Sequence, residues 1–382
     1  MPRPRLRPAP PPRTPVPSTP RAAPPTIPRS SKGPARRRGS PDPPRAPPVD
    51  RFFGPSVPSP PIMRYTPLSR SNTMPATCTR RALLALPAVA GYAIAAPRTK
   101  MTIHLSAGSI GVKADQRQAL DYAHRFGYEA IDAQAGFLSG LDAAQLRDFV
   151  AEMKAKNIVW GTAGLAVDFR TSEENFIRTL GAFPAQCAAL QRAGATRVCT
   201  WISPNSNDLP YLANLRMHAR RLRECARIAG DHGCRVGLEY VGPKTLWSAR
   251  RFPFVHSMKQ MKELIAEIGV GHVGFVLDSW HWFTANETVA DLKSLTSWDI
   301  VSVDLNDAPK GRTVDEQIDS ERELPMATGV IDVGAFLNTL NELGCDAPVR
   351  CEPFNAPLRQ MAPEAALAAT ATAMKKAFDL IR

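Results

Sequence analysis

From residue 101 onward, short apolar runs rich in β-branched residues alternate with longer amphipathic stretches. A short apolar run bounded by turn residues indicates a buried strand, whereas apolar residues three and four positions apart indicate a helix that buries one face. The predicted strands are residues 102–105, 130–133, 159–163, 197–201, 236–240, 273–277, 300–305 and 349–351. The predicted helices are residues 115–126, 143–156, 173–193, 211–232, 255–268, 332–343 and 363–381.

Five of these helices are followed directly by a glycine, the residue that most readily adopts the left-handed conformation of a helix C-cap. Eight strands alternating with helices predict an α/β fold, a (β/α)8 TIM barrel over residues 98–382. The competing open, doubly wound sheet is disfavoured because no G-x-G-x-x-G motif follows the first strand. In a barrel of this kind, functional residues lie at the carboxyl ends of the strands.

The charge of the chain is unevenly distributed. Of its 48 Lys and Arg and 35 Asp and Glu, the first 97 residues hold 16 and 2, together with 26 of the 37 prolines. The remaining 285 residues are therefore almost neutral, and the formal net charge of +13 is no evidence for a nucleic-acid partner. Residues 1–62 form a Pro/Arg-rich tract that we expect to be disordered, unless the true start is Met63 or Met74.

Residues 63–97 have the pattern of an export signal. Arg80 and Arg81 precede an apolar run that is too short to span a bilayer, and Ala93-Ile94-Ala95 provides an A-x-A cleavage site. The paired arginines resemble a twin-arginine signal, which predicts a periplasmic protein without stable membrane insertion after cleavage. Without a functional signal we expect a cytoplasmic protein, and an uncleaved segment would instead serve as a membrane anchor.

Carboxylates occur at the ends of four consecutive predicted strands. The apolar run 273–277 ends at Asp278, with His281 three residues later, and alone this pattern fits either a site or a capping Asp beside a packed His. The fifth, seventh and eighth strands end near Glu239, Asp304 and Glu352. Because strand ends converge at one mouth of a barrel, we expect these four acids to lie close together.

Clustered carboxylates repel one another unless a cation lies among them. A divalent metal would provide that charge; oxygen ligands favour Mg or Mn, and the nearby histidine keeps Zn, Co and Fe open. The alternative is that each acid is separately satisfied by Arg, Lys or backbone amides.

Residues 102–382 resemble the xylose isomerase-like superfamily of sugar phosphate isomerases and epimerases. The resemblance rests on Leu238-Glu239, Leu277-Asp278-x-x-His281, Val303-Asp304-Leu305-Asn306-Asp307 and Cys351-Glu352-Pro353. It implies a metal-dependent sugar isomerase or epimerase whose divalent metal is held by Glu239, Asp278, Asp304 and Glu352. Many epimerase-type members have His where this chain has Asp304, which leaves open whether Asp304 is a ligand or only supports one.

The chemistry implied is proton transfer next to a carbonyl, through an enediolate, with Glu239 and Glu352 as the acid/base pair. His281, Lys244 and Arg322 are candidate substrate contacts, Arg322 by resemblance. Each has a structural alternative: a packed histidine, a solvated lysine and a loop salt bridge. Asn306 and Asp307 are expected to orient the metal ligands through hydrogen bonds.

The segment 308–330 is long for a βα loop, and we expect it to cover the site. The expected partner is a small sugar or sugar derivative, and formation of a homo-oligomer stays open. Two other functions remain: a lyase or dehydratase on the same barrel, and a non-catalytic, exported sugar-binding barrel.

Overall fold

A computed structural model describes residues 99–382, so the predictions for residues 1–62 and 63–97 concern residues outside the described range. The described strands form one parallel sheet and a small antiparallel pair of β6 (Asn205–Ser206) with β8 (Phe252–Pro253). The parallel strands are β1 (Thr102–Leu105), β2 (Ala130–Ile131), β3 (Val159–Trp160), β4 (Ala163–Gly164), β5 (Arg197–Trp201), β7 (Arg235–Glu239), β9 (Val273–Asp278), β10 (Ile300–Leu305) and β11 (Pro348–Cys351).

The predicted third strand, 159–163, is divided into two short strands, and this division closes the barrel. The sheet runs in the order β3-β2-β1-β11-β10-β9-β7-β5-β4. Its two ends, β3 and β4, are halves of the same segment, pairing with β2 on one side and β5 on the other. Between them lies Gly161, where a Cβ atom would come within 2.4 Å of the His104 ring. The sheet is therefore an eight-segment (β/α)8 barrel, as predicted.

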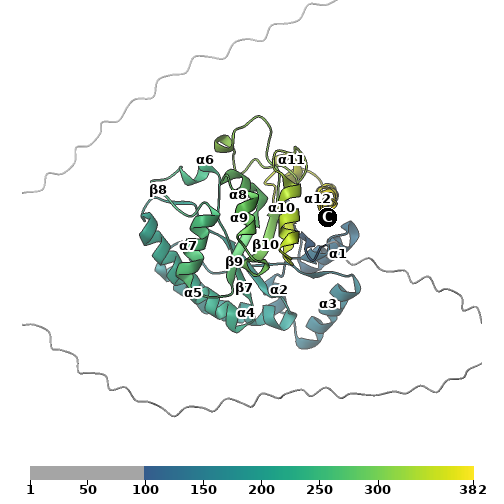
Figure 1. Ribbon diagram of the computed structural model, residues 1–382. Helices are drawn as coiled ribbons and strands as arrows, with labels where there is room; N and C mark the ends of the chain where they lie inside the picture. The colour runs from purple at the N-terminus through teal and green to yellow at the C-terminus, as the bar shows by residue number, and fades with distance from the viewer. Residues whose placement is uncertain (1–98) are drawn as a thin grey trace, which may run out of the picture. The chain divides into compact units, whose positions relative to one another are not determined.

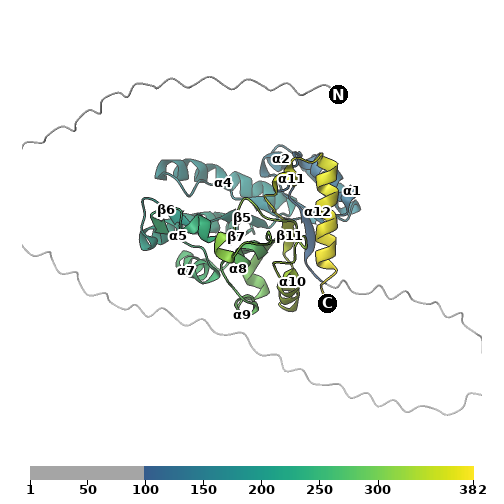
Figure 2. The same cartoon turned by 90° about the horizontal axis from the view of Figure 1, so that it is seen from above.

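Helices surround the sheet on its outer side (Figures 1 and 2). The longer ones are α1 (Gln116–Phe126), α3 (Ala143–Ala155), α4 (Glu173–Ala193), α5 (Tyr211–Asp231), α7 (Met258–Ile268), α10 (Val333–Glu342) and α12 (Pro363–Phe378). Short helices follow several strands: α2 (Ala135–Ser139), α6 (Lys244–Trp247), α8 (Ser279–Thr284), α9 (Val289–Lys293), α11 (Ala356–Arg359), and the 3₁₀ turns η1 (Ser297–Asp299) and η2 (Val314–Glu316).

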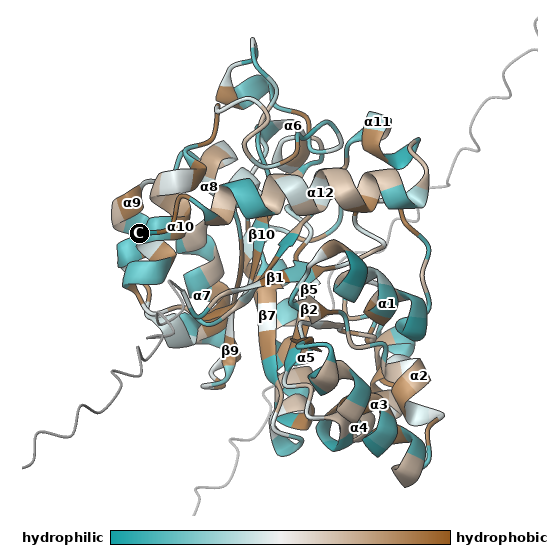
Figure 3. Ribbon diagram, turned by 90° about the vertical axis from the view of Figure 1, so that its right-hand side faces the viewer, coloured by the Kyte–Doolittle hydropathy of each residue, from teal (hydrophilic) through white to brown (hydrophobic). Residues whose placement is uncertain are grey.

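The ends of the helices follow the capping signals in the sequence. Asp115 caps α1 by accepting hydrogen bonds from the backbone of Arg117 and Gln118, and Gly127 ends the helix with φ of 74°. The predicted helix 255–268 begins only at Met258, because Ser257 is its N-cap. Strands β7 and β9 are largely apolar, whereas the helices also carry polar residues (Figure 3). In the part of the chain that the structure describes, no helix combines the length and the hydropathy needed to cross a membrane.

Candidate functional site

The four predicted acids lie together at the carboxyl end of the barrel. Glu239 and Asp278 are the last residues of β7 and β9, Asp304 is one residue from the end of β10, and Glu352 directly follows β11. In the sheet register, Asp304 lies opposite Asp278. One carboxylate oxygen from each of the four side chains lies within 4.8 Å of the others. The parallel register thus brings together acids that are more than 100 residues apart in sequence.

Two arginines lie among these acids. Arg350, on β11, places Nε 2.6 Å from Oδ1 and Nη2 2.7 Å from Oδ2 of Asp304, and Nη2 also lies 3.4 Å from Oε1 of Glu352. Such a two-point pair is among the strongest side-chain contacts in proteins. Arg350 was not predicted, although it precedes Glu352 by two residues and the two side chains therefore leave the same face of the chain.

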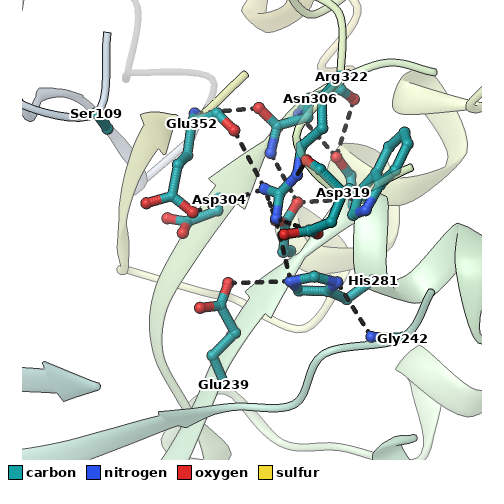
Figure 4. Close-up of polar contacts among 12 residues, drawn as sticks. Ser109, Glu239, Gly242, His281, Asp304, Asn306, Asp319, Arg322 and Glu352 are labelled. Atoms are coloured by element: carbon teal, nitrogen blue, oxygen red, sulfur yellow. Dashed lines mark hydrogen bonds and ion pairs between the residues drawn. The ribbon is translucent and has the colours of Figure 1, made fainter. Parts of the chain in front are cut away.

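Arg322 enters the cluster from the segment 308–330. Its Nη1 is 2.8 Å from Oδ2 of Asp278 and 3.6 Å from Oε2 of Glu352. Its Nη2 is 2.8 Å from Oδ1 of Asp319, in the same segment, and the guanidinium is almost fully buried. Figure 4 shows Arg322 at the centre of this network, with Glu239 and Glu352 approaching the cluster from opposite sides. The long segment therefore supplies part of the site, as its length suggested.

Glu239 has the least compensated of these carboxylates. It is 6% exposed, and its Oε1 has no hydrogen-bond partner among the described residues. Burial, followed by the charges of Asp304, Glu352 and Asp278, raises the pKa of Glu239 well above its usual value. Burial also raises the pKa of Asp278, to about 7, against the opposing effect of Arg322.

The charges of the cluster leave room for a divalent cation. The four carboxylates, together with Asp319, face two guanidinium groups, so negative charge is in excess. The protein can reduce this negative charge by taking up protons or by binding a cation. The raised pKa values of Glu239 and Asp278 express the first of these tendencies. The unpartnered Oε1 of Glu239 and an all-oxygen donor set fit a hard divalent cation. Arginine pairing, one of the two predicted alternatives, is therefore present for Asp304 and Asp278, and the remaining excess of negative charge is the observation that supports a metal.

His281 is buried between the backbone of Gly242 and the acids. Its Nδ1 accepts a hydrogen bond from the backbone N–H of Gly242 at 3.2 Å. Burial and the nearby Arg322 lower its pKa to about 3, so the ring is neutral. Nε2 lies 3.7 Å from Oε1 of Glu239 and 3.8 Å from Oδ2 of Asp278. Nη2 of Arg322 also lies 3.4 Å from Nε2. His281, Glu239 and Asp278 form a second group of side chains that could hold a metal ion.

Asn306 and Asp307 have different roles. Asn306 donates from Nδ2 to Oδ1 of Asp278 at 2.9 Å, and its Oδ1 accepts from the backbone N–H of Glu352 at 3.0 Å, so it fixes two members of the cluster. Asp307 instead accepts hydrogen bonds from the backbone of the long segment, at Thr328, Gly329 and Ile331. In the structure Asp307 therefore anchors the segment that carries Arg322, and its role in orienting the ligands stays a prediction.

Lys244 is the predicted site residue that the structure does not bring to the cluster. It begins α6, is exposed, and forms an ion pair with Asp315 at 2.5 Å. The helix directs it toward the outer side of the long segment, and its side chain does not line the cavity at the barrel mouth. Its role in the structure is a surface contact that joins α6 to η2.

A cavity of about 1140 Å³ opens above the acids. One side is lined by residues of the second half of the barrel, including Glu239, His281, Arg322 and Glu352. The other side is lined by Trp201 and by residues that the sequence did not reveal, among them Asp132, Thr162 and Arg170. Asp132 follows β2 and is held there by Nε2 of His104 at 3.0 Å and by Oγ of Ser106 at 2.7 Å.

A family model described as "Xylose isomerase-like TIM barrel" matches residues 120–377, which include all four acids. The chain belongs to this family. The match spans most of the barrel, so the resemblance predicted from the four motifs is confirmed. The two-point ion pair with Arg350 explains how a buried aspartate is tolerated at position 304.

Several proteins are similar to this chain. Inosose isomerase from Bacillus subtilis (strain 168) is 29% identical over 163 residues, covering 42% of this chain and 53% of that protein. The chain thus spans about half the length of the curated relatives it matches. A xylose isomerase domain protein from Alicyclobacillus acidocaldarius subsp. acidocaldarius has 29% identity and a TM-score of 0.64, covering 73% of this chain and 98% of that one.

The IOLI protein with a bound zinc atom has 19% identity and a TM-score of 0.61, covering 74% of this chain and 99% of that one. At this identity the likeness shows a shared fold. The zinc belongs to that protein; for the present chain, the donor set is the evidence for a divalent cation.

Proposed function

We propose that this protein is a divalent-metal-dependent isomerase or epimerase that moves a proton next to the carbonyl of a sugar or sugar derivative. The observation that carries the proposal is the cluster of four carboxylates with an excess of negative charge, at the carboxyl end of the barrel and beneath an open cavity. The similarity to inosose isomerase, which spans half of that protein, supports the same class of reaction.

Glu239, Asp278, Asp304 and Glu352 are the residues that would hold the metal, with Mg or Mn favoured over Zn by the oxygen donors. A bound divalent cation would polarise the substrate carbonyl and make the adjacent C–H more acidic. Asp304 would share its oxygens with Arg350, so we expect the other three acids to make the stronger contacts.

The acid/base work is assigned to Glu239 and Glu352, which approach from opposite sides of the cluster (Figure 4). Burial and the neighbouring acids raise the pKa of Glu239, which makes its carboxylate a stronger base than an ordinary one. Its Oε1 has no competing hydrogen bond and is free to face substrate. One glutamate removes the proton to give an enediolate, and the other returns a proton to the neighbouring carbon.

Three further side chains bind and orient the substrate in this proposal. Neutral His281 donates its Nε2 proton to a substrate oxygen, and the Gly242 N–H holds the ring in the required tautomer. Arg322 is fixed by Asp278 and Asp319 and presents its charge where negative charge develops on oxygen. Asn306 keeps Asp278 and the backbone of Glu352 in place.

The test is exchange of substrate hydrogen with solvent. The protein comprising residues 96–382 is incubated with Mn²⁺ and a panel of ketoses and inososes in deuterated water, and deuterium incorporation is followed by NMR. We expect incorporation with at least one substrate, and a fall of roughly 10²–10⁴-fold in Glu239→Gln and Glu352→Gln. Lys244→Gln is the matched control, because Lys244 lies outside the cavity.

Other outcomes would distinguish the remaining functions. A product that has lost water would identify a dehydratase on the same barrel. Binding of a sugar without any deuterium incorporation would indicate a non-catalytic binding barrel. Full activity of both glutamine variants would show that the acid/base assignment is wrong.

A further inference from the structure

Arg170 lines the cavity on the side that does not carry the acid cluster. It lies between β4 and α4, in a segment that the sequence did not single out. Its guanidinium carbon is 4.2 Å from the ring centre of Phe169 and 4.4 Å from that of Trp201. Nη2 donates to Oγ1 of Thr200 at 2.8 Å and to the carbonyl oxygen of Trp201. These contacts hold the guanidinium in one orientation.

Arg170 forms no ion pair among residues 99–382; burial lowers its pKa to about 10, against the weaker opposing effect of the Asp168 charge. Arg322 and Arg350, which line the same cavity, are both paired with acids, whereas Arg170 forms no ion pair within 4.0 Å. The neighbouring Asp168 accepts hydrogen bonds from Thr171 and from the Arg170 backbone, and none from the guanidinium. Nε of Arg170 is buried and has no hydrogen-bond partner.

This unpaired cation lies close to the proposed catalytic centre. Trp201, whose carbonyl accepts from Arg170, is the last residue of β5 and is paired in register with Glu239 on β7. Neighbouring strands are about 4.8 Å apart, so Trp201 lies beside Glu239, and Arg170 and Glu239 line the same cavity. The indole of Trp201 is 47% exposed and lines the cavity between them.

A comparable arginine elsewhere in the fold shows what a purely structural role looks like. Arg235, at the start of β7, lies 4.2 Å from the ring centre of Trp298, donates from Nη2 to the carbonyl oxygens of Trp298 and Ile300, and also has an unpartnered Nε. Arg235 does not line the cavity. The packing of the two arginines is alike, and the difference is that Arg170 faces space in which a ligand can bind.

We propose that Arg170 and Trp201 form a subsite for an anionic group of the substrate, a carboxylate or a phosphate, and that the substrate is therefore an acidic sugar derivative. The inference rests on the proposed function, because it places the reacting end of the molecule at Glu239. Partly buried guanidinium groups are stabilised by anionic oxygens, with which they form charge-assisted hydrogen bonds. The exposed indole provides an apolar face against which a sugar ring packs.

Calorimetric titration of the metal-free protein with D-glucose, D-glucuronate and D-glucose 6-phosphate tests the subsite. The three probes share a ring and differ in whether position 6 is neutral, a carboxylate or a phosphate. Without metal, the acid cluster repels anions, so a preference for an anionic probe has to come from a cation in the cavity. We expect at least one anionic probe to bind about tenfold or more tightly than glucose.

Arg170→Gln should abolish this preference while the affinity for glucose stays within about twofold, because a neutral hydroxymethyl group gains little from a charged partner. Arg170→Lys should retain part of the preference, since it keeps the charge and loses the planar fork. Arg235→Gln, which removes the equivalent stacked arginine outside the cavity, should retain all of it. The anionic probe that binds more tightly identifies the group as carboxylate or phosphate.

Equal affinity of the wild-type protein for all three probes would overturn the proposal. So would a preference that persists in Arg170→Gln, or the absence of measurable binding of both anionic probes. These calorimetric affinities can be measured whether or not the protein converts a substrate. If the protein prefers an anionic sugar through Arg170 but shows no deuterium exchange, the subsite is supported and the proposed function is wrong.

Discussion

The two sides of the cavity differ in how their polar groups are compensated. On the side of β7, β9, β10 and β11, four acids and two arginines form one coupled network with an excess of negative charge. On the side of β1 to β5, polar groups form separate, local contacts: Asp132 is held by His104 and Ser106, and Arg170 by Thr200 and Trp201. The first side suits bond making and breaking, and the second suits recognition.

This difference shows why the first side is easier to find in a sequence. A coupled cluster of acids requires the same residue type at the end of each successive strand, and such a repeat is visible along the chain. Local contacts such as that of Arg170 with the Trp201 carbonyl can be built from almost any polar residue near a strand end. They leave no pattern. The following predictions test whether the charged groups influence one another only on the side of β7, β9, β10 and β11.

The largest effect is expected from Arg350→Gln in the metal-free protein. Removing one partner of a buried two-point ion pair leaves Asp304 with an uncompensated charge, at a cost of about 3–5 kcal/mol in the free energy of unfolding. Added Mn²⁺ should recover part of that loss. Urea unfolding with and without Mn²⁺ measures both effects. Arg197→Gln, which breaks the pair with exposed Asp346, should cost less than about 1 kcal/mol.

A pH dependence of stability is the second prediction. Burial raises the pKa of Glu287 to about 7, and its carboxyl accepts hydrogen bonds from the Tyr240 hydroxyl and, at 2.5 Å, from the Met258 N–H. The folded state therefore holds a proton that the unfolded state releases near its ordinary pKa. This stabilisation is complete at low pH and is lost as the pH rises through about 7.

Unfolding free energies measured between pH 4 and pH 8 should therefore fall more steeply in the wild-type protein than in Glu287→Gln, by roughly 3 kcal/mol at most over that range. Glu263→Gln is the matched control, because Glu263 also accepts a hydrogen bond from a tyrosine, Tyr211, but on the surface. Parallel curves for wild type and Glu287→Gln would contradict the assignment.

A smaller effect is expected from Asn306→Ala. Asn306 does not belong to the four acids but fixes Asp278 and Glu352, and partners of this kind typically contribute 10- to 100-fold to metal affinity. Calorimetric titration with Mn²⁺ should show a loss of about that size. Asn341→Ala, which removes only a surface contact with the Arg382 carbonyl, should leave Mn²⁺ affinity unchanged. Unchanged Mn²⁺ affinity in Asn306→Ala would show that Asn306 does not contribute to metal binding.

The smallest effect is expected from Lys244→Ala. Its ion pair with Asp315 is exposed, so the loss of stability should be below about 1 kcal/mol. Unchanged substrate affinity would agree with its position outside the cavity. A large fall in affinity would mean that Lys244 reaches the substrate after all.

Much of the fold followed from local patterns. The ranges 197–201 and 300–305 coincide with β5 and β10, and the range 173–193 coincides with α4, because capping residues and uninterrupted apolar runs define their ends. The break of the third strand at Gly161 was missed, because it depends on His104 from another strand occupying that space. Lys244 was misplaced because position along the chain cannot show which way a short helix turns a side chain.

By itself the sequence determined the barrel, the family and the four converging acids. Strand and helix periodicity are local properties, and a parallel barrel necessarily brings the carboxyl ends of its strands together. Only the tertiary structure decided how the acids are compensated. The pairs of Arg350 with Asp304 and Arg322 with Asp278 join residues 46 and 44 positions apart. The unpaired state of Arg170 likewise depends on every charge around it, because electrostatic balance is a property of the assembled site and not of any segment.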